Sequence, residues 1–166
     1  MNIEELKCIN ENINIEGYLQ FTKKVQESML NPEWLGSLDK EYLINQSQNG
    51  YKIWMYYINN EPVCSMMLMP TREETITKLN LKYNYQEVAD YGPMMVNIKY
   101  IGNSLQYQML KQLDEYSIKQ GYKYALATVH PDNIYSINNF IKDNFIEIGT
   151  RQFKRGLRNI YFKKLV

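Results

Sequence analysis

Histidine is almost absent from this chain, which has one such residue, His130, among 166. A metal centre or catalytic pair that needs two histidines is therefore excluded. Cysteine is scarce as well, because only Cys8 and Cys64 occur, far apart and in no metal-ligand spacing. We expect two buried free thiols in a reducing compartment and no metal site.

An excess of one charge is also missing, since 19 Lys and Arg residues face 18 Asp and Glu residues. Such a balance gives no general attraction to nucleic acid or to a membrane surface, and neither is expected as a partner. No apolar run could span a bilayer, because the longest, residues 63–69, has the length of one strand. The first ten residues carry acids and no apolar core, unlike a signal peptide, so we expect a cytoplasmic protein.

What the chain does have is enough apolar sequence for a sizeable core. Hydrophobic residues make up 45% of it, which argues against disorder. No repeat, linker or low-complexity tract interrupts the pattern, and residues 1–166 are therefore expected to form one domain.

Hydrophobic periodicity predicts a mixed sheet with helices packed on it. Strands are expected over residues 4–9, 51–58, 62–69, 88–98, 122–129, 145–153 and 158–166. Helices are expected over residues 15–30, 37–50 and 134–144, and within residues 100–121, where Asn103 or Ser104 can cap the helix. Residues 71–87 are expected to form a mobile excursion with one helical turn. Pro93, inside a predicted strand, favours an edge, a bulge or a splay at that point.

Two junctions between a strand and a helix, residues 96–105 and 128–136, are the places where chemistry is expected. Gly102 in the first junction allows a ligand to approach the backbone closely. The free amides of Asn103 to Gln106, at the positive end of the helix dipole, would suit a diphosphate. An ordinary strand-to-helix turn would use the same residues, so this spacing alone leaves both interpretations open.

Residues 94–110, MMVNIKYIGNSLQYQML, resemble the acetyl-coenzyme A loop of the GNAT N-acetyltransferase superfamily. The positions that match one branch of that loop are Gly102, Asn103, Leu105 and Gln106. Two positions depart from it, because Ile101 replaces an Arg and Ser104 replaces the second Gly. Residues 128–145 resemble the second coenzyme segment of the family through Asn133 and Ser136, and the order of elements also matches.

The resemblance implies an α/β (α+β) fold with a mixed, mostly antiparallel sheet, splayed central strands and flanking helices. It implies acetyl-CoA as co-substrate and a primary amine as acetyl acceptor, with no metal. The diphosphate would lie on Ile101 to Gln106 and the pantetheine arm beside the backbone of Met95 and Val96. Asn133, Ser136 and Phe140 would line the coenzyme from the other side. Phe140 stands where relatives commonly carry a Tyr that protonates the leaving thiolate.

Asp90 and Glu87 are candidate general bases, because the family often places its base on or before this strand. Either could instead be a solvated residue at the strand entrance. For His130 we favour a histidine that bonds the backbone at its Pro turn over a base. Trp34 could line an acceptor pocket or the edge of the core. Residues 151–164 contain six basic residues and no acid, which fits a solvated hairpin or contact with an anionic acceptor.

Two other classes of function stay open. A non-catalytic acyl-CoA-binding or regulatory module of the same fold would explain Phe140, Ile101 and Ser104. A plain interaction domain without coenzyme would require both coenzyme motifs to arise by chance. The sequence does not identify the acceptor, a small-molecule or peptide amine, or the oligomeric state, which could be a homodimer.

Overall fold

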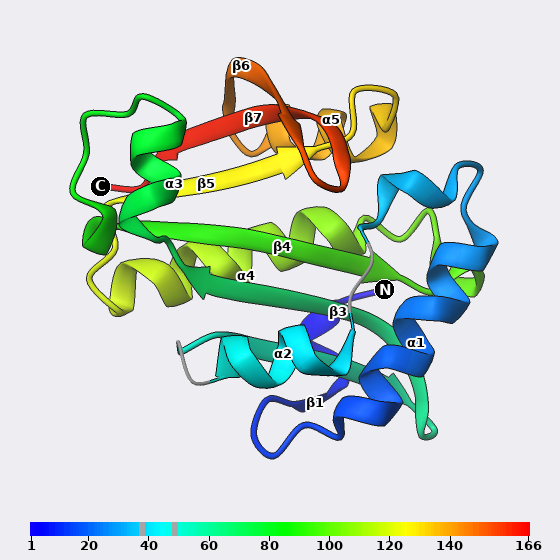
Figure 1. The fold of residues 1–166 in the computed structure, drawn as a ribbon. Coiled ribbons are helices and arrows are strands. Elements are labelled where there is room, and N and C mark those ends of the chain that lie inside the picture. Colours follow the sequence, from blue (N-terminus) through cyan, green and yellow to red (C-terminus); the bar gives the residue numbers. More distant parts are fainter. Residues whose placement is uncertain (37–38, 48–49) are drawn as a thin grey trace.

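Seven strands form one mixed sheet in the order β1-β2-β3-β4-β5-β7-β6 in the computed structural model, which describes residues 1–36, 39–47 and 50–166 (Figure 1). The strands are β1 (Lys7–Ile9), β2 (Lys52–Ile58), β3 (Glu61–Pro70), β4 (Val88–Val96), β5 (Tyr124–Val129), β6 (Ile146–Phe153) and β7 (Gly156–Lys164). The helices are α1 (Ile15–Ser28), α2 (Lys40–Ser47), α3 (Glu73–Lys78), α4 (Leu105–Lys119) and α5 (Ile134–Lys142). Short 3-10 turns are η1 (Ile3–Glu5), η2 (Pro32–Trp34), η3 (Tyr85–Glu87) and η4 (Ile98–Tyr100). All pairings are antiparallel except β4 with β5, so the expected mixed, mostly antiparallel sheet is confirmed.

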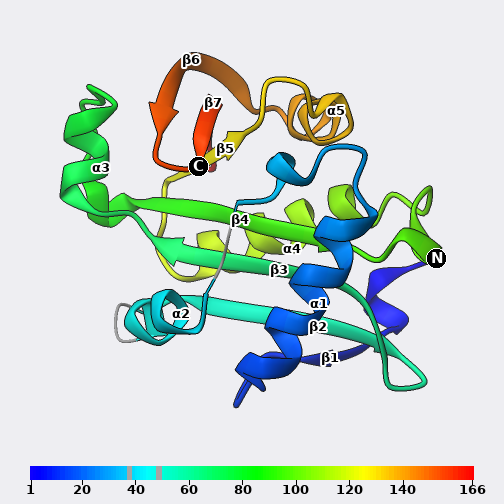
Figure 2. The same cartoon turned by 45° about the vertical axis from the view of Figure 1, so that its right-hand side comes forward.

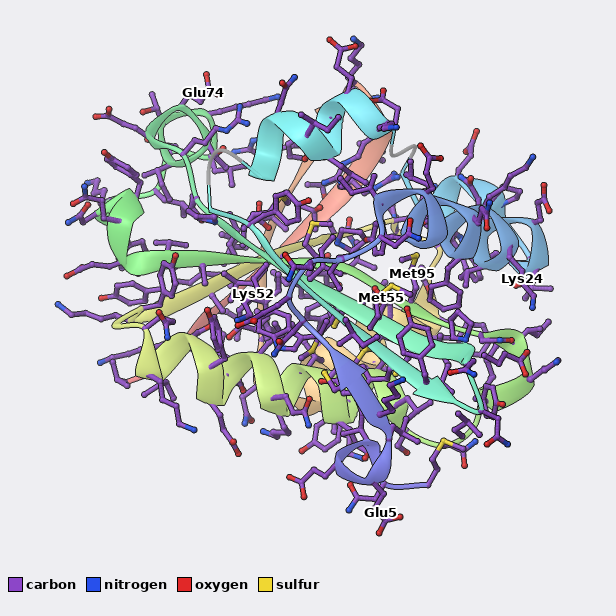
Figure 3. The ribbon with its side chains drawn as sticks, turned by 90° about the horizontal axis from the view of Figure 1, so that it is seen from below. Glu5, Lys24, Lys52, Met55, Glu74 and Met95 are labelled. Atoms are coloured by element: carbon purple, nitrogen blue, oxygen red, sulfur yellow. The ribbon has the colours of Figure 1, made fainter. Side chains whose placement is uncertain are left out.

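Helices cover both faces of this sheet. Helices α1 and α2 lie on one face and α4 on the other (Figure 2). The α4 face holds the largest apolar cluster, which includes Leu105, Met109 and Phe140. On the α1 face, Met55 and Met95 pack with Tyr18 between the sheet and the helix (Figure 3). Burial of these apolar faces is the main force that holds the helices on the sheet.

Local sequence explains where most elements begin and end. Asn14 and Asn133 cap α1 and α5 by accepting a hydrogen bond from the backbone of Gly17 and Ser136. Gly121 follows α4 with a φ of 89°, and Asn144 follows α5 with a φ of 66°. These left-handed caps are the ones that the sequence predicts. The β2–β3 hairpin turns at Asn59 and Asn60, both at positive φ, as two-residue hairpin loops require.

Three segments differ from their predictions. The first strand begins at Lys7 because Asn2 caps the η1 turn just before it. Residues 71–87 hold more structure than one helical turn, since α3 and η3 both lie there. In the predicted helix 37–50, α2 is confirmed from Lys40, whereas residues 37–38 and 48–49 are outside the described part. The expectation of two buried thiols is wrong for Cys8, which is exposed because β1 is an edge strand.

The central strands β4 and β5 pair over only part of their length. Their parallel ladder joins Val88–Tyr91 to Tyr124–Ala127 and then ends, and the two ribbons diverge beyond it (Figure 1). Pro93 follows at once, opposite a register shift in β3 between Met66 and Leu68. A proline cannot donate to a ladder, so it fits this irregular place, as the sequence predicts. We call residues 92–96 of β4 and 128–129 of β5 the β4–β5 splay.

Candidate active site

The splay leaves backbone groups of β4 without a strand partner. The Asn97 amide donates to the Val63 carbonyl at 2.8 Å, so Asn97 faces β3. Backbone groups alternate sides along a strand, and those of Val96 therefore face the splay. Met95 alternates back toward β3, where it pairs with Ser65, and its side chain is buried. Of the two residues predicted to border the pantetheine arm, Val96 thus offers its backbone and Met95 does not.

The start of α4 is open in a way that the sequence does not predict. Ser104 sits in the left-handed region at a φ of 56° and makes no side-chain cap. Ser104 thus occupies the predicted N-cap position without making a capping bond, and the Asn103 side chain donates to the Tyr100 carbonyl at 3.0 Å. Within the described residues, the amides of Leu105, Gln106 and Tyr107 have no acceptor. The helix thus presents unbonded donors at the positive end of its dipole.

Gly102 lies beside this helix start with room around it. Its φ is 92°, a conformation that favours glycine, and a Cβ there would meet nothing within 4 Å. Ile101, which stands in place of the family Arg, is 67% exposed and adds no charge. A phosphate would therefore meet backbone donors at this turn and no Arg side chain at position 101. The Leu105 side chain is buried in the core, so only its amide faces the turn.

The second predicted junction lies next to the first. Gln106 of α4 donates to the Ser136 hydroxyl of α5 at 2.5 Å, and Asn139 donates to Gln106 at 3.0 Å. Asn133 accepts from the Ser136 amide at 3.2 Å. The structure therefore brings Gln106, Asn133 and Ser136 together at the ends of β4 and β5.

Phe140, like Met95, is a predicted coenzyme residue that packs in the core. Its ring is buried, edge-on to Phe145 at 5.0 Å and stacked near Tyr161 at 5.9 Å. Since α5 turns this position toward the α4-face core, Phe140 belongs to the core and not to an open wall.

Asp90 lies near the end of the paired part of β4, one residue before the ladder with β5 ends at Tyr91. Its side chain is partly buried, and desolvation raises the pKa of Asp90 to about 7, although Arg155 pulls it down. The carboxylate has no hydrogen-bond partner in the part of the chain described. A carboxyl with this pKa, at the edge of the splay, can take up and release a proton near neutral pH.

The other two candidate bases have structural partners. Glu87 accepts from Lys123 at 2.6 Å, at the end where β4 and β5 remain paired. Glu87 therefore lies away from the splay, at the other end of the β4–β5 ladder from Val96. The His130 Nδ1 atom accepts from the Asp132 amide at 3.1 Å, which confirms the predicted histidine of a Pro turn.

Arg155 acts on Asp90, and Arg158 lies near Arg155; sequence reasoning left both within a basic hairpin. Arg155, in the β6–β7 turn, donates to the Thr128 hydroxyl on β5. Arg158, on β7, is only 2% exposed. The lack of acids in residues 151–164 was the available signal, but no local pattern shows which of these cations turns inward.

Trp34, the other predicted candidate for an acceptor pocket, is partly buried. Its ring, in η2, lies 6.2 Å from the ring of Tyr135 in α5.

Two other kinds of site find no support among residues 1–36, 39–47 and 50–166. No group of three His, Cys, Asp or Glu side chains there is close enough to hold a metal ion. No helix in these ranges has the length and apolar character needed to cross a membrane.

A sheet of this topology, splayed between its fourth and fifth strands and with a helix start at the splay, is the GNAT acetyltransferase fold. Solved structures match it along almost the whole chain. An N-acetyltransferase from Staphylococcus aureus has a TM-score of 0.71 and 16% identity over 96% of this chain and 99% of that one. A candidate acetyltransferase of the GNAT family from Desulfovibrio desulfuricans has a TM-score of 0.68 and 12% identity over 97% and 99%.

A third match, a candidate acetyltransferase from Salmonella typhimurium, was solved with its cofactor acetyl-CoA. Its TM-score is 0.70, with 11% identity over 98% of this chain and 95% of that one. No family model matches the sequence, and no curated protein matches it at the sequence level. The likeness therefore establishes the fold, and it confirms the fold that the coenzyme-loop resemblance implied.

Proposed function

We propose that this protein is an acetyl-CoA-dependent N-acetyltransferase that acts on a primary amine. One observation carries the proposal: within a GNAT fold, the splay leaves the backbone of Val96 unpaired beside a helix start with unbonded amides. These are donors that a diphosphate and an extended amide chain would use.

The residues at the splay fit the coenzyme. The amides of Leu105 to Tyr107, with open space at Gly102, would hold the diphosphate. The Val96 backbone would pair with the pantetheine arm, and Gln106 and Ser136 would stand beside it. Acetyl-CoA, when bound, supplies an acetyl thioester whose carbonyl carbon accepts the amine.

Asp90 is the residue that we assign as general base. The acceptor enters as an ammonium ion and must lose a proton before its nitrogen can attack. Because the pKa of Asp90 is raised to about 7, its carboxylate is a stronger base than an ordinary Asp and is still largely ionised above neutrality. The Val96 amide would donate to the acyl carbonyl or to the pantetheine.

Phe140 cannot protonate the leaving thiolate. A thiol has a pKa of about 8 to 9, so a thiolate can leave with water as its only proton source. The buried Phe140 nevertheless favours the second candidate function, a non-catalytic acyl-CoA-binding or regulatory module. Its ring has no proton to donate, and it packs in the core and not toward the coenzyme.

Release of the free CoA thiol from acetyl-CoA, measured over a broad panel of amines, separates the two functions. A transferase releases thiol in an amine-dependent way, and the Asp90→Asn variant loses most of that release. Binding of acetyl-CoA without amine-dependent release by the wild type would favour the non-catalytic module. Absence of both would contradict the two together.

A further inference from the structure

Arg158 is a buried cation without an anionic partner. Its guanidinium donates to two backbone carbonyls, those of Leu157 and Glu33, each at 2.8 Å. No carboxylate lies within ion-pair distance of it in residues 1–36, 39–47 and 50–166, although Glu33 attracts it from farther away. Burying a charge without a partner is costly, so structures normally keep such a cation where something anionic meets it.

Arg155 brings a second guanidinium to the same place. Its side chain donates to Thr128 and passes close to the segment that follows η2, because a Cβ on Gly36 would lie 3.2 Å from its Cδ. Burial and the neighbouring charge of Arg155 both lower the pKa of Arg158, which shows that the two cations repel each other. In the described part of the chain Arg155 has no carboxylate within ion-pair distance either.

Both arginines lie on the sheet face that carries Asp90. Along β7, Ile160 and Phe162 pack with Val88 on this face, and Arg158 has the same parity as they do. Thr128, which Arg155 contacts, is two residues beyond Leu126, the β5 partner of Asp90. Arg155 thus lies beside the end of the β4–β5 ladder and acts on Asp90, and Arg158 lies next to Arg155, one residue beyond Asn159, where the β5–β7 pairing ends.

We propose that the acetyl acceptor is a small primary amine that also carries a carboxylate, bound by Arg155 and Arg158. The inference rests on the transferase function proposed above, because it names the acceptor for that same site. The carboxylate would lie against the two guanidiniums, which bind planar oxyanions with paired donors. The amine would then point back toward Asp90, which removes its proton.

The same charges argue against a polycationic acceptor. A polyamine or an aminoglycoside would bring further positive charge against two unpaired guanidiniums, of which one is buried. An amino carboxylate instead places its negative group on the cations and its positive group by the acid. This arrangement matches charge at both ends of the site.

Thiol release with matched pairs of acceptors tests the proposal. The panel would contain the common amino acids, their carboxamides, phosphoethanolamine, spermidine and kanamycin. We expect kcat/KM for the best free acid to exceed that of its carboxamide by about tenfold or more, as one charge-assisted contact provides. Equal rates for acid and amide, or faster turnover of phosphoethanolamine or of a polycation, would overturn the carboxylate assignment and leave the transferase function standing. If no amine in the panel gave amine-dependent thiol release, both the carboxylate assignment and the transferase function would be overturned.

Variants locate the contact. Arg155→Gln, an exposed position that should fold, is expected to abolish the preference for acid over amide. Arg158→Lys keeps the buried charge but loses the paired donors of the planar guanidinium, so KM for the acid should rise. Lys119→Gln, which removes an exposed charge at the end of α4 on the other face, should leave the preference intact. An unchanged preference in Arg155→Gln and Arg158→Lys would overturn the assignment.

Discussion

Asp90 is the residue whose environment has the largest chemical consequence. If it is the general base, activity requires its ionised form, so log(kcat/KM) should rise with pH and bend near pH 7. Asp90→Asn should lower kcat/KM by about two orders of magnitude or more and remove this bend. Steady-state thiol release between pH 5.5 and 9 measures both. A wild-type bend that persists in Asp90→Asn would show that another group titrates.

The same substitution should stabilise the fold. Because the pKa of Asp90 is raised in the folded state above its ordinary value of 3.8, folding favours the protonated form. Stability is therefore lost as pH rises from about 4 toward 7, where the folded protein must ionise a desolvated carboxyl. At pH 8, Asp90→Asn should have a higher melting temperature than the wild type, and the gain should vanish near pH 4. A lower melting temperature at pH 8 would contradict this account of the shift.

Phe140 gives a second prediction at this scale. A hydroxyl added by Phe140→Tyr would enter a packed aromatic cluster with Phe145 and Tyr161. Unsatisfied there, it should cost about 1–3 kcal/mol of unfolding free energy without raising thiol release. Urea unfolding measures the loss, and Phe153→Tyr, at a partly exposed ring, should change little. A more active Phe140→Tyr enzyme would show that the hydroxyl reaches the thiolate after all.

At the scale of elements, the two glycines that flank α4 allow a matched test of the coenzyme site. Gly102 before the helix and Gly121 after it have φ values of 92° and 89°, and a Cβ at either would meet nothing within 4 Å. Valine at each should therefore cost a similar 1–2 kcal/mol or so of strain. Only Gly102→Val should also weaken acetyl-CoA binding, measured by calorimetry, because its side chain would occupy the space beside the free amides. Equal affinities for the two variants would argue that Gly102 serves the turn alone.

The elements also show what a sequence can and cannot predict here. Periodicity and local caps predicted α1, α5, the β2–β3 hairpin and the cap at Gly121, because neighbours in the chain determine them. Pro93 predicted the irregularity of β4 for the same reason. The left-handed Ser104 was missed because serine, unlike glycine or asparagine, gives no local signal for positive φ.

The candidate site was predictable only in part. Gln106, Asn133 and Ser136 were identified through a resemblance, and the structure places them together. The approach of Arg155 to Asp90 joins residues 65 positions apart in the chain, and burial of Arg158 depends on a carbonyl of η2. Such contacts are set by tertiary packing, which leaves no periodic pattern in the sequence.

At the scale of the molecule, a buried ionic network joins β7, α4 and α5. Lys163 contacts both Asp114 and Asp143, the latter at 2.8 Å, and Lys111 reaches Asp143 at 2.5 Å. Lys163→Met should leave Asp114 without a cation and Asp143 with Lys111 alone, and cost about 3–5 kcal/mol in urea unfolding. Lys23→Met, at an exposed pair with Glu27, is the control and should change little. Similar stabilities for the two variants would mean that the network adds nothing to the fold.

The most direct test of the account is the effect of acetyl-CoA on the thermal unfolding of the wild-type protein. A ligand bound only by the folded state at a hundred times its dissociation constant adds about 2.7 kcal/mol of stability. We predict a clear rise in melting temperature at millimolar acetyl-CoA, a rise that is retained in Gly121→Val and much reduced in Gly102→Val. An unchanged melting temperature of the wild type at that concentration would contradict a coenzyme site at the β4–β5 splay.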